Sequence, residues 1–349
     1  MAIPPSLDID LFVLPKGAHE WVLARVKRWE EADSAEPRRE LWRVGPRRRP
    51  LAPGDQVLSL AGERGAGKTW LLQYLAEHDR HLSSRAIYLD LEERFGFEEP
   101  EGYLQAVRNR LENGNQSRRV LLLDAVPPQI DEHLRSVEDE VLRVCLAQRS
   151  SLVIMALDHP CQVCWRSPSL RGGGYFQLSP FQPPQTQRHF QRLQQHGLVR
   201  PGCEADELLK DTTGLPLLNY LLATHPRIEA FELLLKHWFS RIPAEDRERV
   251  RHYLVAVCLL EVLEHGSIQK MLEVYYHYMP DAAGYPAHAS GVRNVLQKYW
   301  LAQAMPGFPG RIVLVESVRH AVEELLRIKD QSLHLLLSEM ATVLCGSRT

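Results

Sequence analysis

The stretch that most constrains this chain of 349 residues runs from Gly62 to Thr69, with the sequence GERGAGKT. It fits the pattern G-x-x-x-x-G-K-[ST] at every fixed position. The apolar run Gln56–Ala61 precedes it, and the segment Trp70–His78, with helical spacing of leucines, follows. Glycines let the backbone curl so that successive N–H groups point at phosphate oxygens, and the helix adds the positive end of its dipole. The sequence therefore predicts a strand, a phosphate-binding loop and a helix.

Each residue type in such a loop has a chemical task. Lys68 is expected to reach the β and γ phosphates, and the hydroxyl of Thr69 to ligate Mg²⁺. We therefore expect a nucleotide with Mg²⁺ as the ligand. The residues predicted to contact it are Gly62, Glu63, Arg64, Gly65, Ala66, Gly67, Lys68, Thr69 and Trp70.

Downstream of the loop, apolar runs alternate with helical patterns. Strands alternating with helices predict an α/β fold, a parallel sheet with helices on both faces and the ligand at the carboxyl ends of the strands. The third strand ends in Asp124, which is expected to hold the Mg²⁺ shell beside Thr69. The predicted strands are Arg85–Leu91, Arg119–Asp124, Ser151–Ala156 and Tyr175–Leu178, and the predicted helices between them are Gly102–Leu111 and His133–Ala147.

Composition excludes several other classes. Lys and Arg number 42 against 44 Asp and Glu, so the overall charge indicates neither nucleic acid nor an anionic membrane as a partner. No apolar run approaches the roughly 18 residues needed to span a bilayer, and the N-terminus lacks a signal-peptide pattern. We therefore expect a soluble, cytoplasmic protein without a membrane partner.

One cysteine pair resembles part of a zinc site. Cys161 and Cys164 follow Pro160 as in the P-C-x-x-C half of a zinc deaminase, but that enzyme also needs an H-x-E element. None of the fifteen histidines has Glu two residues later, which excludes the deaminase. A structural zinc site lacks a fourth ligand nearby. The simpler interpretation is two reduced thiols in a loop.

The order of these parts resembles the STAND class of signal-transduction ATPases, which are related to AAA+ proteins and include the NACHT and NB-ARC regulators. Three segments carry the resemblance: Leu11–Val13 before a predicted helix Glu20–Glu31, the proline-containing end of the fifth strand at Leu178–Phe181, and Gly214-Leu215-Pro216. The last is similar to the G-x-P element whose proline touches the nucleotide base. The resemblance thus implies an adenine nucleotide, ATP or ADP, with Pro216 in contact.

The resemblance also implies a domain organisation. Residues 1–50 form an N-terminal segment and linker, 51–181 the P-loop nucleotide-binding domain, 182–243 a helical lid, 244–330 a winged-helix domain and 331–349 a C-terminal helix. The expected winged helix consists of helices Arg249–Glu264, Ile268–Tyr278 and Gly291–Gln303 and a β-ribbon within Met305–Leu314.

Several positions depart from the family pattern. Ala125 follows Asp124, and Pro127 and Pro128 stand where the family has water-polarising acids, with Asp131 and Glu132 further on. Losing such an acid should slow phosphoanhydride hydrolysis while the loop keeps binding. Other departures are Ala156-Leu157-Asp158 in place of a Thr or Ser followed by a sensor Arg, Val315 in place of a nucleotide-contacting His, and Leu14-Pro15-Lys16 in place of Gly-Arg-Glu. Candidates for an arginine supplied to a neighbouring subunit are Arg166 and Arg171.

The preferred hypothesis is an ATP-binding, STAND-like switch or assembly factor with slow or absent hydrolysis. It would assemble with itself or with a separately encoded effector or sensor, in a bacterial signalling or defence complex. The alternative is an AAA+ or origin-recognition-like ATPase that acts on duplex DNA through its winged helix. Its predicted recognition helix carries only Arg293 and Lys298, where duplex binding needs several phosphate contacts. A third interpretation is a structural subunit that keeps an ATPase fold.

Overall fold

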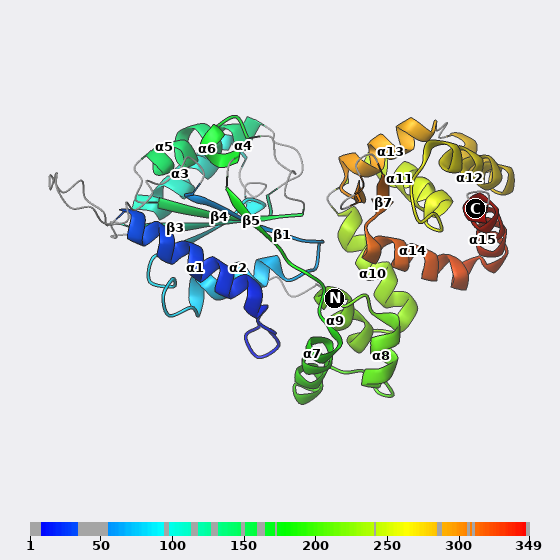
Figure 1. Ribbon diagram of the computed structural model, residues 1–349, viewed down its shortest axis with the longest axis horizontal. Helices are drawn as coiled ribbons and strands as arrows, with labels where there is room; N and C mark the ends of the chain where they lie inside the picture. The colour runs from blue at the N-terminus through cyan, green and yellow to red at the C-terminus, as the bar shows by residue number, and fades with distance from the viewer. Residues whose placement is uncertain are drawn as a thin grey trace, which may run out of the picture. The chain divides into compact units, whose positions relative to one another are not determined.

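The computed structural model describes residues 8–33, 55–93, 98–112, 118–126, 132–147, 151–158, 165–171, 173–240, 242–284, 288–305, 308 and 311–346. The chain divides into two compact units, one up to Ser179 and one from Pro180 onward (Figure 1). Four features named above lie outside the described residues: Pro127 with Pro128, Asp131, the cysteine pair Cys161 and Cys164, and the N-terminal linker from residue 34 to residue 54.

The first unit is built on a sheet of five parallel strands in the order β2-β3-β4-β1-β5. The strand that leads into the phosphate loop, β1, lies between β4 and β5. All five predicted strands are present, with ends within two residues of the prediction. They are β1 (Val57–Ala61), β2 (Ala86–Asp90), β3 (Arg119–Asp124), β4 (Ser151–Leu157) and β5 (Gly174–Gln177).

Helices cover both faces of this sheet. On one face lie α1 (Lys16–Asp33) and α2 (Lys68–Glu77) (Figure 1). On the other lie α3 (Pro100–Glu112), α4 (Glu132–Val137), α5 (Arg143–Ala147) and α6 (Pro168–Arg171). Every residue of β4 is buried, and so are the last five of β3, as expected for a parallel sheet covered on both faces. The predicted α/β fold is confirmed.

Both helices predicted between β2 and β4 have different bounds in the structure, and α3 extends past the predicted Gly102–Leu111 at both ends. The predicted helix His133–Ala147 is interrupted by a π-helical turn, η2 (Glu138–Leu142), between α4 and α5. A π turn accommodates one more residue than an α turn, and here it carries Glu138, a fully buried carboxylate. Gly173, just before β5, is required by packing, because a Cβ there would stand 2.1 Å from the carbonyl oxygen of Val57.

The second unit is helical except for one small ribbon. Its first helices occupy the region predicted as the lid: α7 (Pro183–Gln195), α8 (Ala205–Asp211), α9 (Pro216–Thr224) and α10 (Arg227–Phe239). The region predicted as a winged helix contains α11 (Ala244–Val257), α12 (His265–Tyr278), η3 (Pro280–Gly284), α13 (Ala289–Lys298), the antiparallel strands β6 (Ala302–Ala304) and β7 (Ile312–Leu314), and α14 (Glu316–Lys329). The last helix, α15 (Gln331–Gly346), matches the predicted C-terminal helix.

Two helix ends were predicted wrongly in this unit. The helix predicted to reach Gln303 ends at Lys298, because Trp300 has φ 56°, a left-handed conformation that no α-helix contains, and Gln303 lies in β6. The helix predicted to reach Glu264 ends at Val257, and Glu264 has the extended backbone of the residue that caps α12.

Ion pairs join the two predicted domains of this second unit. The guanidinium of Arg227 on α10 lies 2.6 Å from Glu324 on α14 and 3.0 Å from Asp211 at the end of α8. His320 on α14 bonds the carbonyl oxygen of Asp211 at 2.8 Å. The division at Ser179 falls close to the predicted start of the lid, whereas a boundary at residue 243 stays a prediction. Within the described residues, no helix is long and apolar enough to cross a bilayer.

Candidate functional site: the phosphate loop

The phosphate loop, Gly62–Thr69, connects β1 to α2 as the sequence predicted. Gly65 and Gly67 have φ angles of 84° and 86°, a left-handed region in which glycine is strongly favoured. Gly62 is a glycine for a different reason, because a Cβ there would meet the Cβ of Leu178 at 3.2 Å. Its N–H bonds the carbonyl oxygen of Leu157 at 3.1 Å. The loop is thus fixed at its start and curled at its end.

The N-terminus of α2 is suited to an anion. Gly67 occupies the position before the helix, and a glycine has no side chain with which to cap the first amides. The space beside Gly67 is open, since a Cβ built there would meet no described atom within 4 Å. Donor amides, a helix dipole and open space together fit a phosphate group.

Lys68 is buried in this loop and heavily engaged. Its Nζ donates to the carbonyl oxygens of Gly62 at 2.6 Å and Glu63 at 2.9 Å. It also lies 3.0 Å from Oδ1 of Asp158, whose Oδ2 accepts a bond from Nε of Arg64 at 2.8 Å. The side chains of Lys68, Asp158 and Arg64 are only 9%, 6% and 5% exposed. A single carboxylate therefore bridges two cations of the loop.

Asp124 ends β3 in a buried position, as predicted. The hydroxyl of Tyr88 donates to its Oδ2 at 2.6 Å, and the N–H of Ala125 donates to its Oδ1 at 2.8 Å. Burial raises the pKa of Tyr88 far above its usual range, and the negative charge of Asp124 adds to that rise. The phenol therefore stays protonated and holds the carboxylate in one orientation. Ala125 has φ 52°, a strained conformation directly after this carboxylate.

A second carboxylate lies beside Asp124. Asp90 ends β2 directly opposite Asp124 in the parallel register. Burial raises the pKa of Asp90, and the charge of Asp124 raises it further. The strand order places Asp90, Asp124, Asp158 and the phosphate loop along the carboxyl edge of one sheet. This is the edge where ligands of open parallel sheets bind.

The donors at this edge fit a magnesium ion shared with a phosphate. Mg²⁺ in such sites uses one or two protein groups together with phosphate oxygens and water. Thr69, in the first turn of α2, and Asp124 are the residues that would hold it, directly or through water. Across the described part of the chain, no cluster of three or more His, Cys, Asp or Glu is placed to hold an ion by itself.

Sequence reasoning missed three partners in this site. The sequence pattern places Tyr88 only within a predicted strand, and Asp158 only where a sensor arginine is missing. For Arg64 it predicts a contact with the nucleotide and not the ion pair with Asp158. The available signal was positional: Asp158 directly follows the strand next to β1, so its side chain starts at the edge that holds the loop.

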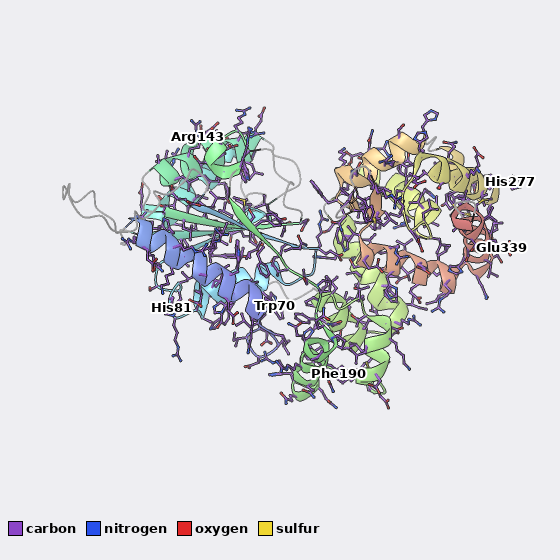
Figure 2. All side chains as sticks on the ribbon, in the orientation of Figure 1. Trp70, His81, Arg143, Phe190, His277 and Glu339 are labelled. Carbon is purple, nitrogen blue, oxygen red and sulfur yellow. The ribbon has the colours of Figure 1, made fainter. Side chains whose placement is uncertain are left out.

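The N-terminal segment packs on the helix of the phosphate loop. Phe12 is buried and contacts Trp70 edge-on, with ring centroids 6.2 Å apart, and Tyr74 at 5.5 Å. Trp70 lies on α2 in the first unit (Figure 2). Its described aromatic contact is thus with Phe12, and its predicted contact with the nucleotide stays a prediction.

The motif Gly214-Leu215-Pro216 has a structural role in the second unit. Gly214 has φ 79°, and a Cβ on it would stand 2.3 Å from the carbonyl oxygen of Phe181. The N–H of Phe181 donates to the carbonyl oxygen of Gly214 at 2.7 Å. Two of the segments that carry the family resemblance therefore contact each other. Pro216 is the first residue of α9, and its contact with the base stays a prediction.

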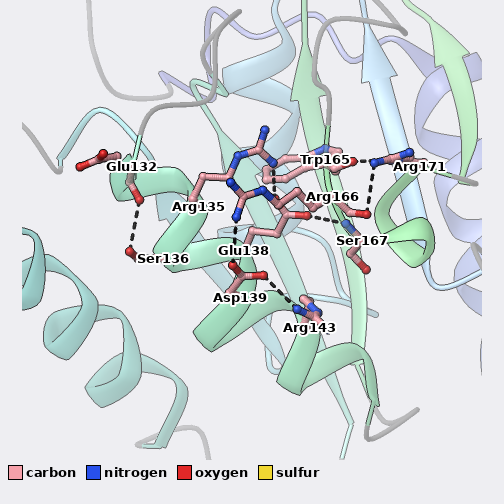
Figure 3. A network of polar contacts seen from close by, with 10 residues as sticks. All are labelled: Glu132, Arg135, Ser136, Glu138, Asp139, Arg143, Trp165, Arg166, Ser167 and Arg171. Carbon is pink, nitrogen blue, oxygen red and sulfur yellow. Dashed lines mark hydrogen bonds and ion pairs between the residues drawn. The ribbon is translucent and has the colours of Figure 1, made fainter.

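The two candidate arginines differ in their surroundings (Figure 3). Arg171 donates to the carbonyl oxygens of Trp165 and Arg166, so its guanidinium holds this turn. The N–H of Ser167 donates to Glu138 at 2.7 Å, which fixes the same segment to η2. Arg166 is 68% exposed and lies 3.9 Å from Asp139. Both arginines are exposed, but Arg171 is tied to two backbone carbonyls, whereas the described side-chain contact of Arg166 is the long one to Asp139.

Two residues of the second unit concern the nucleotide contact that the family resemblance implies and the DNA-binding alternative. Val315, which stands where the family has a nucleotide-contacting His, is buried at the start of α14, and its N–H bonds the carbonyl oxygen of Leu301 at 2.9 Å. Lys298, a cation of the predicted recognition helix, lies 3.7 Å from Asp246 and over the ring of Tyr299. An acidic partner reduces what Lys298 offers to a DNA phosphate.

Comparisons with known proteins give structural likeness only. No family model matches the sequence, and no curated protein matches it. A solved structure of the Thermotoga maritima RuvB Holliday junction branch migration motor matches 85% of this chain and 93% of its own, with 16% identity and a TM-score of 0.38. A structure described as a DNA replication initiation factor matches 97% of both chains, with 13% identity and a TM-score of 0.42. One from work on katanin self-assembly matches 66% of this chain and 72% of its own, with 13% identity and a TM-score of 0.40. With values this low, none of these likenesses bears on what the chain binds or does.

Proposed function

We propose that this chain is an adenine-nucleotide-binding P-loop protein that works as a slow switch or assembly factor. The observation that carries the proposal is the phosphate loop itself, with Lys68 in the loop, Gly67 at the start of α2, and Asp124 on the same sheet edge. Phosphate would bind the loop amides and Lys68, while Thr69 and Asp124 would hold Mg²⁺. Adenine, and the contact of Pro216 with it, rest on the family resemblance.

Slow hydrolysis follows from the groups around Asp124. Phosphoryl transfer depends on positioning and on charge stabilisation at the γ-phosphate, and a residue must orient the attacking water. The residues described directly after Asp124 are Ala125 and Val126, and neither is an acid. Where the family has a sensor arginine, the chain has Asp158, which carries the opposite charge. Turnover should therefore stay well below the median enzyme rate of about 10 per second, which a phosphate-release assay measures directly.

The switch part of the proposal concerns the second unit. Ion pairs join α8, α10 and α14, which supports the idea that the second unit moves as one rigid piece when nucleotide binds. Nucleotide would then favour one arrangement of the chain, which assembles with itself or with a separately encoded effector, as in a signalling or defence complex. Light scattering of the protein with and without Mg-ATP tests this step. A monomer of unchanged dimensions in both samples, and with candidate effectors added, would favour the structural-subunit interpretation.

The nucleotide-binding test is a comparison of the wild type with Lys68→Ala by calorimetry. The affinity of the variant for the nucleotide should be lower by roughly a hundredfold or more, because a charge-assisted contact to phosphate disappears. Lys210→Ala, a change in the second unit, is the control and should bind as the wild type does. Equal affinities for the wild type and Lys68→Ala would refute the proposal.

The DNA-acting alternative keeps a weaker basis. Its predicted helix is shorter than expected and begins at Ala289, and Lys298 lies beside Asp246. Measured binding to duplex DNA would restore this alternative if its affinity fell with salt concentration as steeply as the neutralisation of several phosphates requires.

A further inference from the structure

We propose that Asp158 is an internal counter-ion that competes with the nucleotide for the phosphate loop. A phosphate can bond Lys68 fully only after the ion pair between Lys68 and Asp158 breaks. The strength of this ion pair therefore sets the affinity of the site for the nucleotide. This inference rests on the proposed nucleotide-binding function and adds a regulatory contact to it.

The position of Asp158 follows from the sheet. β4 lies beside β1, and their last paired residues are Leu157 and Ala61. Asp158 and Gly62 are the next residues of the two strands, so the carboxylate starts beside the first residue of the phosphate loop. The backbone bond from Gly62 to Leu157 fixes this approach. The carboxylate is thus placed by two neighbouring strands and not by a flexible loop.

The contacts are those of a tight, enclosed ion pair. Both carboxylate oxygens are used, Oδ1 by Lys68 and Oδ2 by Arg64, at 3.0 and 2.8 Å. All three side chains are less than a tenth exposed. Water and salt screen such a pair much less than one at the surface, so the attraction between its charges is stronger, and removing the carboxylate leaves buried cations without it.

A phosphate and this carboxylate need the same cation. Lys68 Nζ has three hydrogens, and its described acceptors are the carbonyls of Gly62 and Glu63 and the carboxylate of Asp158. A β or γ phosphate oxygen that bonds Lys68 must therefore replace one of these acceptors. The two carbonyls belong to the loop backbone, whereas the carboxylate of Asp158 ends a side chain that can rotate, so Asp158 is the acceptor that a phosphate can displace. Arg64 belongs to the same loop and is released by the same exchange.

The test variant is Asp158→Asn, which keeps the size and one acceptor oxygen but removes the charge. Its Kd for Mg-ATP should fall roughly tenfold relative to the wild type, within the range measured for coupling between close buried charges. Without nucleotide, Lys68 should also react faster with an amine-acylating reagent, read by mass spectrometry. The matched control is Asp79→Asn, because Asp79 is equally buried and lies outside the phosphate loop. Its Oδ2 lies 2.7 Å from Nε2 of His19. It should change neither readout.

The outcomes separate the two proposals. Wild-type binding of Mg-ATP that Asp158→Asn fails to tighten, with Lys68 no more reactive, overturns the competition alone. Absence of ATP binding in the wild type and in Asp158→Asn alike overturns the proposed function together with it. Circular dichroism verifies folding, and if Asp158→Asn is unfolded, the smaller neutral variant Asp158→Ser gives the same two readouts.

Discussion

The two halves of the carboxyl edge of the sheet, one at β1 and β4 and the other at β2 and β3, carry opposite arrangements of charge. Beside β1 and β4, two cations of the phosphate loop, Lys68 and Arg64, share one buried carboxylate, Asp158. Beside β2 and β3, two carboxylates, Asp90 and Asp124, lie opposite each other, and the described hydrogen-bond donors to Asp124 are the neutral hydroxyl of Tyr88 and the neutral amide of Ala125. With two cations to one carboxylate, the first half keeps an excess of positive charge that Asp158 partly neutralises, and the second half carries an excess of negative charge.

This difference indicates what each half can bind. A half with excess negative charge attracts a cation and needs no displacement, which suits Mg²⁺ beside Asp124. In the phosphate-loop half both cations already bond Asp158, so an anion gains their full attraction only when it displaces this carboxylate. We therefore expect the metal side of the site to be ready for its ligand and the phosphate side to be restrained.

The largest effect on this comparison should come from Asp124→Asn, which removes the metal-side charge. Wild-type protein should bind ATP about tenfold or more tightly with Mg²⁺ than with EDTA, and the variant should lose most of that enhancement, because an amide is a poorer ligand for a hard cation. Titrations of ATP with and without Mg²⁺ measure it.

Asp139→Asn is the control, since Asp139 is a half-exposed acid of the same unit that pairs with Arg143. An Asp124→Asn variant that keeps the full Mg²⁺ enhancement would contradict the assignment of Asp124 to the metal.

Local patterns were enough to predict the strands, the phosphate loop and the position of Asp124. Each of these depends on the period of apolar residues or on residue types at fixed spacing. The contacts of Asp158 were not predictable in this way, because Arg64 and Asp158 are far apart in the sequence and meet only when β4 pairs with β1. The same holds for Tyr88 and Asp124, which meet through the pairing of β2 with β3.

The wrong helix ends have a different cause. The pattern of apolar residues continues past Lys298, but the backbone at Trp300 turns left-handed to let Ala302 pair with Leu314. Tertiary pairing overrides helical spacing there. In η2, burial of Glu138 accompanies a wider turn that side-chain periodicity does not reveal.

A smaller effect is expected from Tyr88→Phe, which removes one donor to Asp124 and keeps the ring. The free energy of unfolding should fall by about 1.5–3 kcal/mol, the usual contribution of a hydrogen bond to a charged group. The Mg²⁺ enhancement of ATP binding should also fall, but by less than in Asp124→Asn, because Asp124 keeps its charge and loses only part of its orientation.

Urea unfolding and the same Mg²⁺ titration measure both quantities for Tyr88→Phe. Tyr175→Phe is its control, because Tyr175 on β5 is 60% exposed. Identical results for the two variants would mean that the phenol does not support the metal side.

The smallest effect is expected from Asp90→Asn, and its sign tests whether the β2–β3 half carries excess negative charge. Burial and Asp124 raise the pKa of Asp90, so the folded state holds this proton more strongly than the unfolded chain does. Stability from that proton is present below the unfolded pKa of about 3.9 and is lost as the pH rises through the folded pKa.

Asparagine stays neutral and keeps an acceptor for the N–H of Glu92, which bonds Asp90 at 2.8 Å. The variant should therefore be more stable than the wild type at pH 7, by up to about 1 kcal/mol, with the difference vanishing towards pH 4. Thermal unfolding across this range measures it. A variant that is less stable by the same amount at every pH would show that the charge of Asp90 is compensated, and the contrast between the two halves would then fail.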